Sequence, residues 1–243
     1  MDGFSSCRKP PNLKAMQNKR LPSGIKAALI DMDGVLYDSM PFHASSWHQL
    51  FTQLGVENSD PAEYYLYEGM KGSDTIELIL KRELNRDTTP EERDRIYAEK
   101  ADLFRHLGQA PMMPGAAEML QGLKKLGLDT VLVTGSAQPS LLDGIERDYP
   151  GFFPPEKRVT AFDVKNGKPH PEPYLRGLEK AGVDKSEAIV IENAPLGVRS
   201  GKAAGLFTIT VTTGPIPAEV FEKEGADLIF PDMKTFAEWL HNI

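Results

Sequence analysis

The fold of this chain is decided by the stretch Ile25-Lys26-Ala27-Ala28-Leu29-Ile30-Asp31-Met32-Asp33-Gly34. Its first six residues form a short, mainly apolar run, which is typical of a strand buried in a parallel sheet. Two aspartates follow the run at alternate positions, and Gly34 permits a sharp exit from the strand. Three later runs have the same character, and we expect them to join the same sheet. They are Thr130–Thr134, Ala188–Glu192 and Phe207–Val211.

Helical patterns alternate with these strands, and each ends at a glycine that can cap it. Strand–helix–strand alternation implies right-handed crossovers and a doubly wound sheet, so the fold class is α/β with a Rossmann-like parallel-sheet core. Ligands of such sheets bind beyond the carboxyl ends of the strands, where Asp31, Thr134 and Glu192 stand. The helical segments are Ala116–Leu126, Pro173–Ala181 and Leu196–Ala204.

A long segment after the first strand has no strong strand pattern, and we expect an inserted helical cap there. Thr89-Pro90-Glu91-Glu92 is a good helix start, with a capping hydroxyl, a proline at the first position and acids in the first turn. The expected division is a core of residues 22–38 and 111–243 and a cap of residues 39–110. The cap helices are expected at Phe42–Leu54, Pro61–Tyr67, Asp74–Glu83 and Pro90–Leu107.

The overall composition is that of an ordinary globular protein, with 40% hydrophobic and 26% charged residues among 243. A formal net charge of -7 argues against nucleic-acid or anionic-membrane partners. A single cysteine, Cys7, forms no internal disulfide, and no stretch is long and apolar enough to span a bilayer, so we expect a cytoplasmic protein. Residues 1–21 are polar and basic; we expect a disordered tail, with a binding arm or a start at Met16 as alternatives.

The pair Asp31 and Asp33 is the main candidate for chemistry. Carboxylates at alternate positions just past a buried strand can hold a hard divalent cation through oxygen ligands. They also allow a division of labour, with one carboxylate as nucleophile and the other as general acid and base. The alternative is a pair of turn or capping aspartates, which is common on protein surfaces.

Four motifs in order resemble the haloacid dehalogenase (HAD) superfamily, and the resemblance covers nearly the whole chain after the tail. The first motif, DxDGxL, is Asp31–Leu36, and the second is Thr134 after an apolar strand. The third is Lys168, before a proline-rich helix start, and the fourth is the pair Glu192-Asn193 after another strand. The insertion after the first motif resembles the helical cap of the family.

The resemblance implies phosphoryl transfer through an aspartyl-phosphate on Asp31, with Asp33 protonating the leaving group and then activating water. It implies that Thr134 and Gly135 bind the phosphoryl group and that Lys168 offsets the charge on phosphate and nucleophile. Without the resemblance, Thr134 is also explained as a β-branched strand residue and Lys168 as an exposed lysine.

The resemblance also implies Mg²⁺, held by Asp31, the backbone carbonyl of Asp33 and the side chain of Asn193, with Glu192 acting directly or through water. Asn193 is a departure, because many relatives have aspartate there. An amide oxygen can ligate Mg²⁺ with one negative charge fewer, so we expect a lower metal affinity.

Longer phrases, Asp31–Pro41 and Ile191–Val198, resemble the β-phosphoglucomutase-like branch, which contains mutases, phosphatases and inorganic pyrophosphatases. Its mutases hold a second phosphate with basic residues in a cap loop, which here is Tyr67–Ser73. Glu68 stands where the mutases have lysine, and Gly72 where they have arginine. The basic residue that mutases place just after the second motif is also missing.

Glu68 would repel a sugar phosphate, but it is able to help bind a metal-complexed diphosphate or to orient a leaving group. A surface acid at a helix end is the alternative, and a slip of one residue would put Lys71 in the cationic position. His43 resembles the histidine that mutases place near the general acid, and an ordinary helix-surface histidine is its alternative. Trp47, His48 and Phe51 are expected to pack within the cap.

From these residues we expect a Mg²⁺-dependent phosphohydrolase acting on a small phosphorylated substrate, with inorganic pyrophosphate as a leading candidate. A β-phosphoglucomutase and a sugar-phosphate phosphatase are the alternatives within the family. A non-catalytic phosphate-binding module is the alternative from another class. We expect a monomer or a weak oligomer, with neither a nucleic acid nor a membrane as partner.

Overall fold

A six-stranded parallel sheet in the order β3-β2-β1-β4-β5-β6 forms the centre of the computed structural model. The structure describes residues 20–137 and 139–243, so all but the last two residues of the expected tail lie outside the described part. Within the described part, no helix has the length and apolar character needed to cross a bilayer. The strands are β1 (Ala27–Ile30), β2 (Asp129–Val133), β3 (Arg158–Val159), β4 (Ala188–Glu192), β5 (Phe207–Val211) and β6 (Leu228–Phe230).

The strand order reverses beside β1, and this reversal places the site. Ile30 of β1 is paired with Leu132 of β2 on one side and with Ile191 of β4 on the other. Asp31 therefore comes level with Val133 and Glu192, at the carboxyl ends of three adjacent strands. Such a switch point opens a crevice in which ligands bind.

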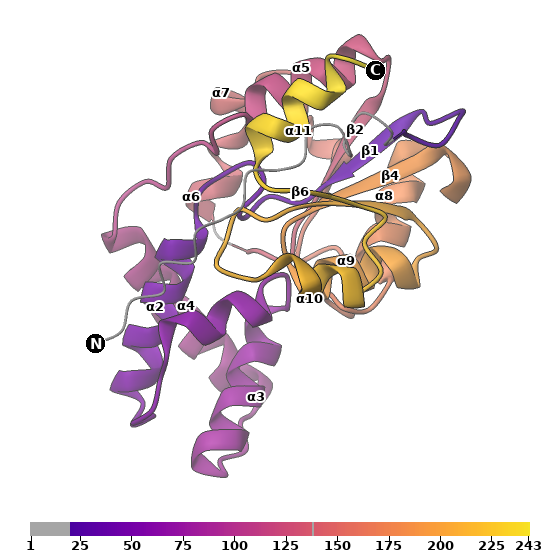
Figure 1. Cartoon of the computed structure of the whole chain (residues 1–243). Helices are drawn as coiled ribbons and strands as arrows, with labels where there is room; N and C mark the ends of the chain where they lie inside the picture. Colours follow the sequence, from indigo (N-terminus) through magenta and orange to yellow (C-terminus); the bar gives the residue numbers. More distant parts are fainter. Residues whose placement is uncertain (1–19, 138) are drawn as a thin grey trace.

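Helices cover both faces of the sheet (Figure 1). Inward side chains of α5 and α11 pack with alternate strand residues such as Ile30 and Leu132, while α8 packs on the opposite face against Leu29 and Val133. Buried strands with two apolar faces explain why the sequence runs are continuously apolar. The core helices are α5 (Ala116–Lys125), α6 (Pro139–Leu142), α7 (Ile145–Asp148), α8 (Glu172–Ala181), α9 (Pro195–Ala203), α10 (Ala218–Lys223) and α11 (Met233–Leu240), with 3-10 turns η2 (Pro155–Lys157) and η3 (Lys185–Glu187).

The segment after β1 forms a separate helical group beside the sheet edge that carries the site (Figure 1). It has an apolar cluster of its own, in which Phe51 stacks on both Trp47 and Tyr64 at centroid distances of 5.4 and 5.8 Å. The Thr89 side chain accepts a hydrogen bond from the N–H of Glu92, which confirms the expected helix start. The elements are α2 (Met40–Gln53), η1 (Pro61–Tyr67), α3 (Gly72–Leu84) and α4 (Pro90–His106).

The expected helix at Pro61–Tyr67 is present with the same bounds, but it is a 3-10 helix. It begins at the Asp60 cap, and Tyr64 is the one buried residue of its seven. The strands β3 and β6, of two and three residues, went unrecognised because such short strands show no periodicity. The elements follow the expected division into core and cap, but its boundaries at residues 39 and 110 stay a prediction.

Candidate active site

Asp31 lies at the centre of the buried polar cluster. Its backbone N–H donates to the carbonyl of Ile191, which holds the residue in line with β4. The Lys168 ammonium donates to Asp31 Oδ1 at 2.5 Å, to Glu192 Oε1 at 2.6 Å and to the Val133 carbonyl at 3.1 Å. The structure therefore brings together the first, third and fourth motifs around one lysine, and Lys168 is buried, not exposed.

Glu192 is fixed by further donors that the sequence did not reveal. The Tyr174 hydroxyl donates to Oε1 at 2.6 Å, and the N–H groups of Asn193 and Ala194 donate to Oε2 at 3.0 and 3.2 Å. A Cβ on Gly197 would lie 1.8 Å from Oε1, so only glycine leaves room for this carboxylate at the start of α9. Glu192 therefore serves first as the rigid partner of Lys168.

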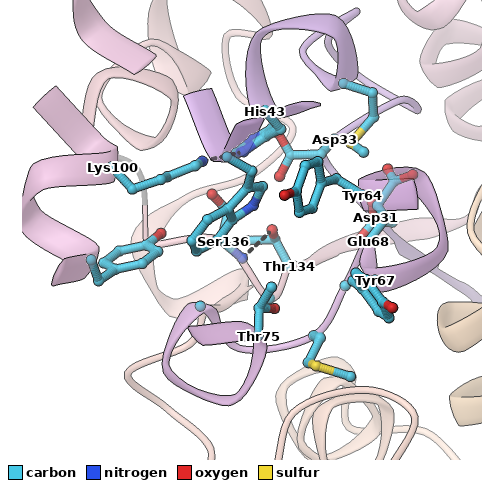
Figure 2. A pocket seen from close by; sticks show the side chains of 17 residues that line it. Asp31, Asp33, His43, Tyr64, Tyr67, Glu68, Thr75, Lys100, Thr134 and Ser136 are labelled. Atoms are coloured by element: carbon cyan, nitrogen blue, oxygen red, sulfur yellow. Dashed lines mark hydrogen bonds and ion pairs between the residues drawn. The ribbon is translucent and has the colours of Figure 1, made fainter. Parts of the chain in front are cut away.

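Asp33 begins a chain of hydrogen bonds that runs into the cap. The Ser39 hydroxyl donates to Asp33 Oδ1 at 2.6 Å, and His43 Nε2 lies 2.9 Å from the same oxygen. On the far side of the ring, Nδ1 of His43 lies 2.6 Å from Nζ of Lys100 (Figure 2). The expected contact between His43 and Asp33 is confirmed, and His43 is buried between Asp33 and Lys100 rather than on the helix surface.

Lys100 is the functional candidate that sequence reasoning missed. It is 1% exposed and lies 5.0 Å from the ring centroids of both Trp47 and Phe104. A signal was present, since Ile96, Lys100 and Phe104 follow one another at four-residue spacing and all face inward from α4. A lysine on the apolar stripe of an amphipathic helix has no packing reason to be there.

The pKa values of this chain of groups are set by burial and by mutual charge. Burial lowers the pKa of Lys100 from its usual 10.5 to about 7, against the attraction of Asp33. The pKa of His43 is lowered by burial and by the neighbouring Lys100. Burial alone would raise the pKa of Asp33, but His43, Ser39 and Lys100 together bring it below its usual value. The arrangement that fits is an ionised Asp33, a neutral His43 and a Lys100 whose charge changes near neutral pH.

The charges around Asp31 are not balanced. Burial, Glu192 and Asp33 raise the pKa of Asp31 well above its usual value, although Lys168 opposes the shift. Burial also lowers the pKa of Lys168, but the ion pairs to Asp31 and Glu192 outweigh it and the net shift is upward. One lysine thus serves two carboxylates, so the cluster favours the arrival of a further positive charge.

Thr134 and Gly135 lie across the cavity from the cap, at the end of β2. The Thr134 N–H donates to the Val159 carbonyl at 2.9 Å, and the N–H of Ser136 donates to Thr134 Oγ1 at 2.9 Å. One lone pair of the Thr134 hydroxyl oxygen thus accepts the Ser136 N–H, and the hydroxyl proton points in another direction. Both residues line the same cavity as Asp31 and Asp33.

Glu68 reaches the core from the cap loop. Its Oε1 accepts a hydrogen bond from Asn193 Nδ2 at 2.8 Å, and the residue is 7% exposed, so a surface acid is the wrong interpretation. Burial, and then the nearby Asp31 carboxylate, raise the pKa of Glu68 well above its usual value. Gly34, at φ +76, passes directly beneath this pair: a Cβ there would lie 1.9 Å from Asn193 Nδ2.

The amide oxygen of Asn193 supplies the test of whether a cation fits this site. Oδ1 is buried and has no hydrogen-bond partner among the described residues. Buried polar atoms in proteins are nearly always hydrogen-bonded, so this oxygen is unusual. No three His, Cys, Asp or Glu side chains converge on one point in residues 20–137 and 139–243. A cation at the site would therefore use amide or backbone oxygens as well, and Asn193 Oδ1 with Asp31 is such a donor set.

The cavity between cap and core measures about 50 Å³ and is lined by both aspartates, Glu68 and Thr134 together with aromatic cap residues (Figure 2). Lys71 does not point into it, because its ammonium donates to the carbonyls of Val164 and Lys165 at 3.2 and 3.5 Å. The sequence alternative in which Lys71 replaces the missing cation is therefore wrong for this arrangement.

Four further aromatic and histidine side chains lie in or near the site, and of these four Trp47 alone lines the cavity. Trp47 and Phe51 belong to the apolar cluster of the cap, as expected. His48 Nδ1 lies 3.2 Å from Ser59 Oγ, outside the cavity lining. His170 Nδ1 accepts from the N–H of Glu172 at 3.1 Å, so it shapes the loop that carries Lys168.

The parallel sheet has a helical insertion after β1, and Asp31 is ion-paired with Lys168 at the strand ends. Together with the family match that follows, these features indicate an α/β phosphohydrolase. Residues 25–205 match the model of the haloacid dehalogenase-like hydrolase family, and the chain belongs to that family, in its β-phosphoglucomutase-like branch. It is 30% identical to 2-deoxyglucose-6-phosphate phosphatase 2 of Saccharomyces cerevisiae, over 86% of this chain and 88% of that protein. It is 29% identical to hexitol phosphatase A of Escherichia coli, over 86% and 92%.

A solved structure gives the same result for the fold. The chain is similar to a candidate β-phosphoglucomutase from Bacteroides vulgatus, with 48% identity and a TM-score of 0.84, over 90% of this chain and 89% of that one. The names of these relatives thus divide between phosphatases of small phosphorylated carbohydrates and a mutase.

Proposed function

We propose that this enzyme is a Mg²⁺-dependent phosphohydrolase that forms an aspartyl-phosphate on Asp31 and transfers it to water. The observation that supports this most is the position of Asp31, with Oδ1 held 2.5 Å from the Lys168 ammonium and the carboxylate exposed to the cavity. A fixed carboxylate with a fixed cation is arranged for in-line attack on phosphorus, since positioning and charge provide most of the catalysis in phosphoryl transfer.

Asp33 is the group we assign to proton transfer. It protonates the leaving group as the phosphoryl group moves to Asp31, and it then takes a proton from the water that hydrolyses the intermediate. His43, Ser39 and Lys100 keep it ionised in the free enzyme. A dianionic phosphoryl group entering beside Asp33 opposes that effect and raises its pKa, so the proton becomes available when substrate is bound.

Thr134 and Gly135 are assigned to the phosphoryl oxygens, and Lys168 to the charge that builds up between phosphate and nucleophile. Asp31, the Asp33 backbone carbonyl and Asn193 Oδ1 would hold Mg²⁺, and Glu192 would act mainly by fixing Lys168. Bound there, Mg²⁺ supplies neutralising charge for the phosphate and lowers the pKa of the Asp31 carboxylate. The unpartnered Asn193 oxygen is the feature of the free protein that supports this assignment.

Inorganic pyrophosphate is the substrate we propose first, and Glu68 is the reason. A buried carboxylate stands over the nucleophile where a second ester phosphate would need a cation. Lys71 is turned away, and Lys100 is engaged with His43. A magnesium diphosphate brings its own positive charge to Glu68, which lines the cavity together with Asp31. The same features argue against a mutase, whose bisphosphate needs two cationic sites.

A sugar-phosphate or polyol-phosphate monoester is the second candidate. The yeast and Escherichia coli relatives carry names of such phosphatases, and the cavity wall includes Trp47, Tyr64, Tyr67 and Tyr97. Aromatic rings beside hydroxyl groups are a common surface for carbohydrate binding. We further expect a monomer or weak oligomer in the cytoplasm, which size-exclusion chromatography and cell fractionation test.

The experiment is a phosphate-release screen with and without Mg²⁺, using pyrophosphate, 2-deoxyglucose 6-phosphate, hexitol phosphates and nucleotides. We expect Mg²⁺-dependent release from pyrophosphate with the highest kcat/KM and no conversion of β-glucose 1-phosphate. Highest turnover of a sugar or polyol phosphate would replace the first substrate by the second. Efficient formation of glucose 6-phosphate from β-glucose 1-phosphate would contradict hydrolysis, and an Asp31→Asn variant with full turnover would contradict the mechanism.

A further inference from the structure

The cap loop is tied to the core by a side chain that the mechanism does not use. Lys71, the residue before α3, extends its ammonium to the carbonyls of Val164 and Lys165 at 3.2 and 3.5 Å. These carbonyls belong to the core segment that leads into Lys168. The contact therefore joins the loop of Glu68 to the loop of Lys168.

The core segment is held from its other side by Glu172, the first residue of α8. One carboxylate oxygen of Glu172 accepts from the N–H of Lys165 at 2.8 Å, and the other accepts from the N–H of Asn166 at 2.9 Å. These two backbone hydrogen bonds are the main reason why the pKa of Glu172 falls to about 2. Glu172 is thus charged at every physiological pH.

Lys71 and Glu172 act on the same two peptide groups from opposite ends. The Val164 carbonyl and the Lys165 N–H belong to one peptide group, and the Lys165 carbonyl and the Asn166 N–H belong to the next. In a trans peptide the C=O and N–H point in opposite directions. An N–H aimed at the Glu172 carboxylate therefore aims its carbonyl at the Lys71 ammonium, and both peptide dipoles lie along the field between the two charges.

Glycine allows the close approach. A Cβ on Gly167 would lie 2.6 Å from Cγ of Lys71 and 3.1 Å from its backbone nitrogen. A Cβ on Gly135 would likewise lie 2.3 Å from the carbonyl oxygen of Gly69, the residue after Glu68. The cap loop thus rests on two core loops that carry no side chain at the contact points, and the polar ties decide where it rests.

We propose that Lys71 and Glu172 are a pair of positioning residues, coupled through the two peptide groups between Val164 and Asn166, which seat Glu68 over Asn193 and Lys168 beside Asp31. Neither side chain touches the reacting atoms. Their effect reaches the site because Glu68 lies three residues from Lys71 and Lys168 lies two residues from Asn166. The inference rests on the proposed hydrolysis for its activity readout only.

The test is a double-mutant cycle in full-length protein, with Lys71→Met, Glu172→Gln and the combination, measured as kcat/KM on the best substrate of the screen. Loss of a charge-assisted hydrogen bond sets the expected size, so Lys71→Met lowers kcat/KM about tenfold. The combination is expected to be no worse than about twofold below Lys71→Met alone, because each change removes the same tie. Lys71→Arg restores most of the activity. Lys81→Met is the matched control, since Lys81 lies in α3 and forms an exposed ion pair with Asp87 in the loop after that helix, and it leaves kcat/KM unchanged.

Amide hydrogen exchange on the same variants gives a readout independent of catalysis. We expect faster exchange in residues 68–75 for Lys71→Met and also for Glu172→Gln, which lies on the core, but not for Lys81→Met. The proposal would be overturned if the fold-losses in kcat/KM of the two single variants multiplied in the double variant. It would also be overturned if amide exchange in residues 68–75 were the same in Glu172→Gln as in wild type. If no phosphate substrate is turned over, the proposed function fails. The amide exchange result still tests whether Lys71 and Glu172 position the cap loop.

Discussion

Replacing Lys100 by methionine is expected to stabilise the protein while it impairs the enzyme. Lys100 is buried beside Trp47 and Phe104, and an unbranched apolar side chain of similar length suits that place. The removed group is one whose pKa burial lowers from 10.5 to about 7. At a pH where the unfolded chain carries this lysine protonated and the folded protein does not, the free energy of unfolding is lowered.

The sign and size follow from the two pKa values. Between about pH 7 and 10.5 the unfolded chain binds the proton and the folded protein does not, so wild-type stability falls as the pH falls through this window. The loss of wild-type stability caused by Lys100 is about 4 kcal/mol at about pH 7, approaches about 5 kcal/mol at lower pH, and is about 1.4 kcal/mol at about pH 9.5. Losing the hydrogen bond to His43 Nδ1 costs the variant about 1–3 kcal/mol at every pH. A net gain of about 2 kcal/mol is therefore expected near pH 7.

Urea denaturation of wild type and Lys100→Met, followed by far-ultraviolet circular dichroism at several pH values, measures this difference. The gap in unfolding free energy is expected to narrow by about 3 kcal/mol between about pH 7 and 9.5. Lys81→Met controls for removal of an exposed lysine and shows no such trend. A gap that stays constant with pH would refute the inference that Lys100 titrates near neutrality. In wild type we expect kcat/KM to change near pH 7, where Lys100 loses its proton. This limb of the pH profile is expected to be absent from Lys100→Met.

Three further changes test the site. Asn193→Asp adds a charge to the proposed Mg²⁺ donors, so the Mg²⁺ concentration for half-maximal activity is expected to fall about tenfold. In the presence of chelator the thermal midpoint is expected to fall, because the new carboxylate would face Glu68 Oε1, which lies 2.8 Å from Asn193 Nδ2. An unchanged Mg²⁺ dependence would remove Asn193 from the donor set. Glu68→Gln is expected to lower kcat/KM on pyrophosphate at least about tenfold more than on p-nitrophenyl phosphate, and an equal loss on both would separate Glu68 from specificity. Gly135→Ala, whose Cβ would meet the Gly69 carbonyl at 2.3 Å, is expected to raise KM about tenfold with less than about 1 kcal/mol change in unfolding free energy; an unchanged KM would contradict close contact of the loops.

Much of the core could be predicted because its signals are local. The four apolar runs were found within one or two residues of β1, β2, β4 and β5, and the motif residues after them could be grouped from strand topology alone. Edge strands of two or three residues have no pattern to detect. The contact of Asp31 with Lys168 joins residues 137 positions apart, and it was reached by family resemblance, not from the local sequence.

The cap side of the site was harder to predict for a physical reason. Glu68 and Lys71 are three residues apart on one loop, yet one faces Asn193 and the other faces the Val164 carbonyl. Their directions depend on which core loops the cap rests against, and nothing in the loop sequence encodes this. Lys100 was predictable in principle, because a charge on an apolar helical stripe is visible in the sequence. Its partner His43 lies 57 positions away, and the local sequence does not show that the two side chains meet.

Phosphoryl transfer through Asp31 is tested most directly by trapping the intermediate. Enzyme turning over its best substrate with Mg²⁺ is quenched with borohydride, which reduces an acyl phosphate to an alcohol, and the peptide containing residues 26–47 is sequenced by mass spectrometry. Conversion of Asp31 to homoserine, dependent on substrate and on Mg²⁺ and absent from Asp33, is the predicted result. Product release in the same sample with an unmodified Asp31, or with the modification on Asp33, would contradict the assigned nucleophile.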